Sequence, residues 1–190
     1  MKTITLSFLT FGLLLGAAGP GFAGSAEVQP PFEQPILLTS AGQSADVQLA
    51  NVLLKKAGLT FRLAKLASAR DLENSRTLVL VIGASLKGLG AAGLDMGKEK
   101  ERVSGLLAAA REKSIPVVCL HLGGADRRGE ITDALVTEYL PLAKAALVVK
   151  SGNKDGLFTK LCADKKIPLV EVEKTIDAAD ALKKLFKPLT

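Results

Sequence analysis

The chain has 190 residues, of which 48% are hydrophobic and 23% charged, and it carries a net charge of +6. This length and composition suit one globular domain with a sizeable core. The basic residues form no block, and aromatic residues make up only 4% of the chain. It therefore lacks the concentrated basic face and the stacking aromatics of nucleic-acid-binding proteins. We expect no nucleic-acid partner and a mild preference for small anions or anionic surfaces.

Residues 1–23 resemble a secretory signal peptide. Lys2 supplies a positive start, residues 4–18 are mostly apolar, and small residues follow up to Ala23. The alternative is a retained membrane anchor, but the apolar run is shorter than the roughly 20 residues that cross a bilayer. We predict export to the periplasm or the medium, with cleavage after Ala23 or Ala26 and no stable membrane insertion afterwards.

The rest of the chain divides into an extended leader, residues 24–34, and a single α/β domain, residues 35–188. Strands are predicted at residues 35–40, 59–66, 77–82, 116–122, 145–149 and 168–172. Helices are predicted at residues 44–56, 98–113, 131–139, 156–165 and 176–186. The glycine-rich residues 83–93 are predicted to form a long flexible loop after the strand at 77–82.

The alternation of strands and helices indicates parallel strands joined by right-handed crossovers. We therefore predict a three-layer αβα sandwich around a mainly parallel sheet of about six strands, Rossmann-like or flavodoxin-like, with the favoured order 2-1-3-4-5-6. The strand at 59–66 is expected near an edge because it carries Arg62 and Lys65.

Two polar segments mark the predicted site, since ligands of such sheets lie beyond the carboxyl ends of the strands, where the winding direction reverses. With this order, the position lies between the strands at 35–40 and 77–82. The first segment leads into a helix N-terminus, which favours anions, and the second adds a lysine. We predict a small polar or anionic ligand there; the alternative is that the serine at 44 caps a helix and the glycines only form turns. The candidate ligand-binding residues are Thr39, Ser40, Gly42, Gln43, Ser44, Ser85, Lys87 and Gly88.

These two segments, residues 35–44 and 83–93, resemble a family of exported bacterial proteins known only as a domain of unknown function. The similarity covers residues 35–186. It implies an exported α/β domain and transfers no catalytic residues.

The glycines at 88, 90 and 93 match the dinucleotide-binding pattern G-x-G-x-x-G. In that pattern the glycines turn directly from strand to helix, whereas residues 94–97 intervene here. The next strand also ends in His121-Leu122-Gly123-Gly124 and lacks the acidic residue that binds the ribose. We expect no nucleotide or other cofactor, and we expect residues 85–97 to form a mobile cover over the site.

A hydrolase is the alternative function from another class. Ser85 is the candidate nucleophile, and His121, the only histidine, ends the neighbouring strand and is the candidate base. However, the serine lacks the glycines of a nucleophile elbow, and one histidine is not a triad. The simpler interpretation is a histidine hydrogen-bonded at a strand end. A protein-interaction domain without a small-molecule site is the third alternative.

No metal site is expected, because one histidine and two distant cysteines offer no ligand spacing. Cys119 lies in an apolar strand, which favours a buried free thiol. Pairing with Cys162 is the alternative in an oxidising compartment.

Overall fold

The computed structural model describes residues 32–188. The predicted signal peptide and most of the leader therefore lie outside the described residues. Within the described part of the chain, no helix is both long and apolar enough to span a membrane.

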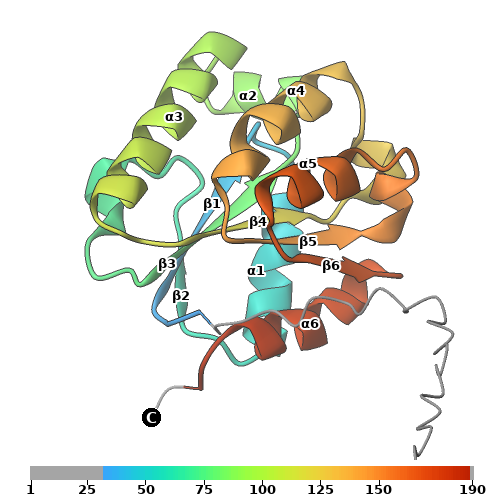
Figure 1. Cartoon of the computed structure of the whole chain (residues 1–190). Helices are drawn as coiled ribbons and strands as arrows, with labels where there is room; N and C mark the ends of the chain where they lie inside the picture. The colour runs from blue at the N-terminus through green and yellow to red at the C-terminus, as the bar shows by residue number, and fades with distance from the viewer. Residues whose placement is uncertain (1–31, 189–190) are drawn as a thin grey trace, which may run out of the picture.

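The domain is built on one sheet of six parallel strands in the order β2-β1-β3-β4-β5-β6 (Figure 1). This confirms the predicted α/β class and strand order. The shortest strand, β2, lies at an edge of the sheet, as was predicted from the charges of Arg62 and Lys65. The strands are β1 (Ile36–Ala41), β2 (Phe61–Leu63), β3 (Thr77–Ile82), β4 (Val117–His121), β5 (Ala145–Val149) and β6 (Leu169–Val172).

Helices cover both faces of the sheet and complete the three layers. One face packs against α1 and α6, and the other against α3, α4 and α5 (Figure 1). The helices are α1 (Asp46–Lys56), α2 (Leu86–Ala91), α3 (Met96–Glu112), α4 (Glu130–Tyr139), α5 (Leu157–Lys165) and α6 (Ala178–Leu185).

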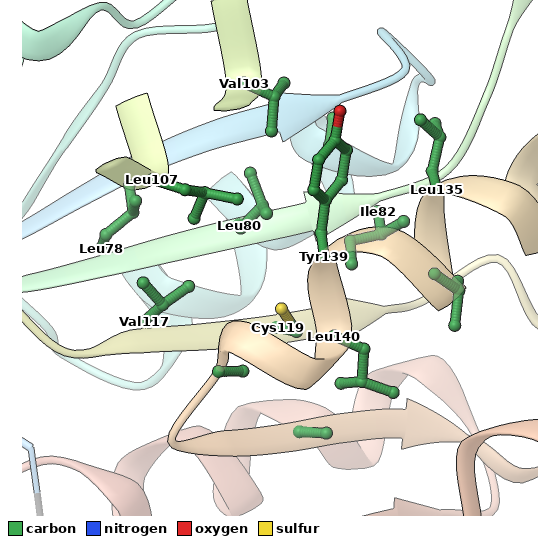
Figure 2. Close-up of a cluster of buried hydrophobic side chains, with 14 of the residues drawn as sticks. Leu78, Leu80, Ile82, Val103, Leu107, Val117, Cys119, Leu135, Tyr139 and Leu140 are labelled. Atoms are coloured by element: carbon green, nitrogen blue, oxygen red, sulfur yellow. The ribbon is translucent and has the colours of Figure 1, made fainter. Parts of the chain in front are cut away.

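The central strand β3 is apolar on both faces because both are covered. Leu78, Leu80 and Ile82 point into one cluster, and Val79 and Val81 point into the other. Figure 2 shows the first cluster, where side chains of β3 and β4 meet those of α3 and α4.

The two cysteines are buried free thiols, as the apolar surroundings of Cys119 predicted. Burial raises the pKa of the Cys119 thiol far above its usual range, and it raises that of Cys162 to about 11. Both thiols are therefore protonated and poorly reactive at neutral pH.

The glycine-rich residues 83–93 were predicted to form a long flexible loop. That prediction is wrong, because they contain the short helix α2. Ser85 is its N-cap, and its Oγ accepts a hydrogen bond of 3.1 Å from the backbone N–H of Gly88. Leu89 anchors the helix in the interior. Docking against the domain overrides the low helix propensity of the glycines.

A second difference concerns α4. Its sequence pattern places Ile131 on the inner face, but this side chain is 38% exposed and Thr132 is buried instead. The Thr132 hydroxyl accepts a 3.0 Å hydrogen bond from the backbone N–H of Ala84. The threonine thus connects α4 to the segment that follows β3.

Candidate ligand-binding site

The turn after β1 and the start of α2 are joined directly at the carboxyl ends of β1 and β3. Gln43 and Ala84 form an antiparallel bridge. Beside it, the N–H of Ser44 donates to the carbonyl of Gly83 at 3.2 Å, and the N–H of Ser85 donates to that of Gly42 at 2.8 Å. The two predicted segments therefore meet at one edge of the sheet, where the strand order reverses.

A hollow of about 500 Å³ lies against these segments, and we call it the switch-point hollow. Its lining includes five of the eight candidate ligand-binding residues and one charged residue that the sequence analysis missed, Lys65. That lysine follows the edge strand β2. The hollow is lined by Gln43, Ser44, Ala45, Lys65, Leu66, Ser85, Lys87, Gly88, Ala91 and Ala92.

Three candidate residues, Thr39, Ser40 and Gly42, do not line the hollow. The first two lie within the ladder between β1 and β3, because β1 continues to Ala41, one residue beyond the predicted strand end. Both are fully buried, and the Thr39 hydroxyl donates to the carbonyl of Lys65 at 3.1 Å. The hydrogen bond of Thr39 thus connects β1 to the segment that carries Lys65.

Gly42 has a conformational role in the turn. Its φ of +97° lies in a region that side chains disfavour, and a Cβ at this position would lie 2.6 Å from the carbonyl oxygen of Gly83. Gln43 follows with a φ of +56°. The close approach of β1 and β3 at their ends thus depends on the absence of a side chain.

A buried carboxylate holds this turn from below. Oε1 of Glu99, in the first turn of α3, accepts hydrogen bonds from the backbone N–H of Gly42 at 2.8 Å and from Nε2 of Gln43 at 3.0 Å. Glu99 is completely buried. The amide of Gln43 is therefore committed to the scaffold, although this residue was predicted to bind ligand.

The charge of Glu99 is neutralised by Arg102, one turn along α3. The guanidinium donates to both carboxylate oxygens, from Nε at 2.9 Å and from Nη2 at 2.8 Å. It also donates to the carbonyls of Ala67, at 2.8 Å, and Ser40, at 2.6 Å. One ion pair thus connects β1, the turn after it and the segment after β2, and these bound the hollow.

Two of the lining residues, Ser44 and Ser85, carry hydroxyl groups. The Oγ of Ser44 accepts from the N–H of Asp46 at 3.3 Å, as the Oγ of Ser85 does from Gly88. Each hydroxyl has one proton and can accept as well as donate. Neither hydroxyl donates a hydrogen bond within residues 32–188; Ser85 is partly exposed, whereas Ser44 is only 2% exposed.

Two cations complete the lining. Lys65 and Lys87 are exposed, and neither forms an ion pair within residues 32–188. No side chain lining the hollow in this described part of the chain is acidic. The site therefore combines two positive charges with the partly exposed hydroxyl of Ser85.

His121 and Ser85 are not brought together as a catalytic pair. The imidazole is buried, with Nδ1 3.1 Å from the carbonyl oxygen of Ile82 and Nε2 3.2 Å from that of Gly124. Burial lowers the pKa of His121, although the two carbonyls act in the opposite direction. The histidine is thus hydrogen-bonded at a strand end, and it does not contact the serine on which the hydrolase alternative depends.

No metal-binding cluster is formed by the described residues: within 32–188, no three His, Cys, Asp or Glu side chains are placed to share an ion. Acidic side chains near the site are already paired. Asp46, at the start of α1, accepts a 3.2 Å hydrogen bond from Nε of Arg127.

The family model described as a domain of unknown function (DUF6305) matches residues 33–186, which include every element of this site. The chain belongs to this family. The resemblance seen in the sequence is thereby confirmed, whereas export remains a prediction. None of the curated proteins matches the sequence.

Solved structures with weak similarity include two hydrolases. A GDSL-like lipase from Bacteroides thetaiotaomicron is 14% identical, with a TM-score of 0.32; the match covers 72% of this chain and 66%, just under two thirds, of the lipase. AlinE4, an SGNH-hydrolase family esterase, is 12% identical with a TM-score of 0.28, and 82% of each chain is covered. At these values neither structure informs the chemistry of this protein.

Proposed function

We propose that this protein binds a small anion, such as a phosphate or carboxylate compound, in the switch-point hollow. The observation that carries the proposal is the lining itself, which offers two unpaired ammonium groups and the partly exposed hydroxyl of Ser85, and no carboxylate. Cationic and hydroxyl donors favour a ligand that only accepts hydrogen bonds and carries negative charge.

The size of the hollow supports a small molecule. Its volume of about 500 Å³ lies within the range of roughly 300–1,000 Å³ that is typical of ligand pockets. Apolar side chains, including Leu66 and Ala91, form part of the wall. The ligand therefore has an anionic group and a compact body with some apolar surface.

Replacing both lysines, in the variant K65M/K87M, is expected to weaken anion binding at least about tenfold, because two charges are removed from the lining. Both residues are exposed, so the fold is expected to be unaffected. Binding is measured by calorimetry with inorganic phosphate, succinate and glucose 6-phosphate, with glucose as the uncharged comparison. At least one of the anions is expected to bind, and more weakly as salt is added.

The matched control is K183M/K184M, which removes the same charge from exposed positions on α6. It is expected to bind the anion as the parent protein does. Binding of none of the three anions, or equal losses in the two double variants, would contradict the proposal.

We also propose that the chain is exported and that its first 23 or 26 residues are removed. The support is the order of positive, apolar and small residues at the N-terminus. When the full chain is expressed in a bacterium, mass spectrometry of the fractionated cells is expected to find a soluble form that begins at Gly24 or Glu27. An uncleaved chain confined to the cytoplasm or the membrane would refute this proposal.

A further inference from the structure

A second hollow, of about 790 Å³, lies at the other end of the strands, against the amino ends of β4 and β5. We call it the basal groove. The end of α3 forms one wall, and the segment that follows α4 forms another. It shares no lining residue with the switch-point hollow.

The floor and walls of the basal groove are largely apolar. Leu107 and Val117, both labelled in Figure 2, contribute from α3 and β4, and Ile167 contributes from the segment before β6. Leu142 lies at the mouth and is 55% exposed. Exposed leucine beside a concave apolar surface is typical of a site that binds an apolar group.

Three cations, Arg111, Lys144 and Lys165, lie along the same groove. None of them forms an ion pair within the described residues 32–188. The acidic residue in the lining, Glu138, is already paired with Lys100 at 2.7 Å. The groove therefore carries an excess of positive charge beside its apolar surface.

Helix stability explains only part of this charge. Arg111 and Lys165 lie in the last turns of α3 and α5, where a cation offsets the partial negative charge of a helix C-terminus. Lys144 precedes β5, lies in no helix and gains no such stabilisation. Its position favours recognition of an anion at the groove.

The backbone of the groove has few donors to offer a peptide. The N–H groups of Lys144, Ile115 and Ile167 already donate within the domain, each at 2.8 Å, to carbonyls of Val117, Ala110 and Cys162 respectively. Both β4 and β5 also have a neighbouring strand on each side, so no strand can be added. A ligand with one anionic group and an apolar chain needs no backbone partner.

We propose that the basal groove binds a fatty carboxylate, with the acyl chain on the apolar floor and the carboxylate beside Lys144 and Lys165. This site is independent of the anion site at the switch-point hollow. Such a ligand carries one negative charge at the end of an aliphatic chain. The charge matches the cations of the groove, and the chain matches its apolar surface.

Decanoate, below the concentration at which it forms micelles, tests the proposal by calorimetry with the full chain. Saturable binding is expected, and octanoate is expected to bind about tenfold more weakly because two methylene groups are lost. Decan-1-ol is expected to bind more weakly than decanoate. Tyr139 lines the groove and is the only tyrosine in a chain without tryptophan, so its fluorescence reports binding locally.

The variant K144M/K165M is expected to bind decanoate at least tenfold more weakly, and L142S several-fold more weakly. The control K183M/K184M, which removes the same charge from exposed positions on α6 outside the groove, is expected to bind as the parent does. Melting temperatures verify that each variant is folded. Absence of saturable binding, equal affinity for decan-1-ol, or unchanged affinity in K144M/K165M would overturn the proposal, whatever the result at the switch-point hollow.

Discussion

Replacement of Arg102 with methionine is expected to lower the free energy of unfolding by about 3–5 kcal/mol. The substitution leaves Glu99 completely buried without its counter-charge, and it removes the donors to the carbonyls of Ala67 and Ser40. Buried polar groups that lose a partner keep the cost of desolvation and lose the compensating bond. The effect should therefore far exceed the loss of one surface ion pair.

Urea unfolding followed by circular dichroism measures this change, since the chain has no tryptophan for fluorescence. K100M is the matched control, because it removes the half-exposed pair between Lys100, on the same helix as Arg102, and Glu138 of α4. It is expected to cost less than about 1 kcal/mol. Equal losses in R102M and K100M would show that the buried pair does not hold the turn.

The double variant E99Q/R102M separates the buried charge from the packing. Glutamine at position 99 keeps a side-chain oxygen to accept from Gly42 and carries no charge. The double variant is expected to be more stable than R102M, although it is expected to be less stable than the parent protein. A double variant that is less stable than R102M would mean that the uncompensated charge is not the main cost.

Replacement of Gly88 with alanine is expected to lower the free energy of unfolding by about 1–3 kcal/mol. A Cβ at this position in α2 would overlap the backbone carbonyl oxygen of Gln43. That oxygen belongs to the turn held by Glu99, so the overlap cannot be relieved by rotating a side chain. The strain outweighs the roughly 1 kcal/mol that alanine gains over glycine in a helix.

Gly90, two residues further along the same helix, provides the comparison. A Cβ there would meet no atom within 4 Å. G90A is therefore expected to be neutral or to raise the free energy of unfolding by up to about 1 kcal/mol, through helix propensity alone. Both variants are measured in the same urea series, and a loss of equal size in G90A would argue against packing of α2 on the turn. Since α2 forms a wall of the switch-point hollow, G88A is also expected to weaken anion binding, whereas G90A is not.

The site shows where sequence reasoning succeeds and where it does not. The two segments that meet at the hollow were predicted from strand order, because the carboxyl ends of neighbouring parallel strands share one edge. Lys65 was missed as a lining residue, although its strand was placed at an edge. Its position depends on how the segment after β2 folds back over β1, and local sequence carries no signal for that.

The buried ion pair was missed for a related reason. Glu99 and Arg102 lie in the run Lys98-Glu-Lys-Glu-Arg102, which has the composition of a solvated helix face. An i,i+3 pair of opposite charge is common on exposed helices. Only the packing of α3 against the turn after β1 removes these two side chains from water and leaves Lys98 outside.

For this protein, the sequence by itself determined the class of fold, the order of its strands and the edge at which polar segments gather. These features follow from apolar periodicity and from the handedness of crossovers, which are properties of local segments. The tertiary structure alone decided that residues 86–91 form a helix and which polar side chains support the hollow or line it. Those outcomes depend on contacts between segments distant along the chain, such as Gly88 with Gln43 and Glu99 with Gly42, where exclusion of water changes the energy of each group.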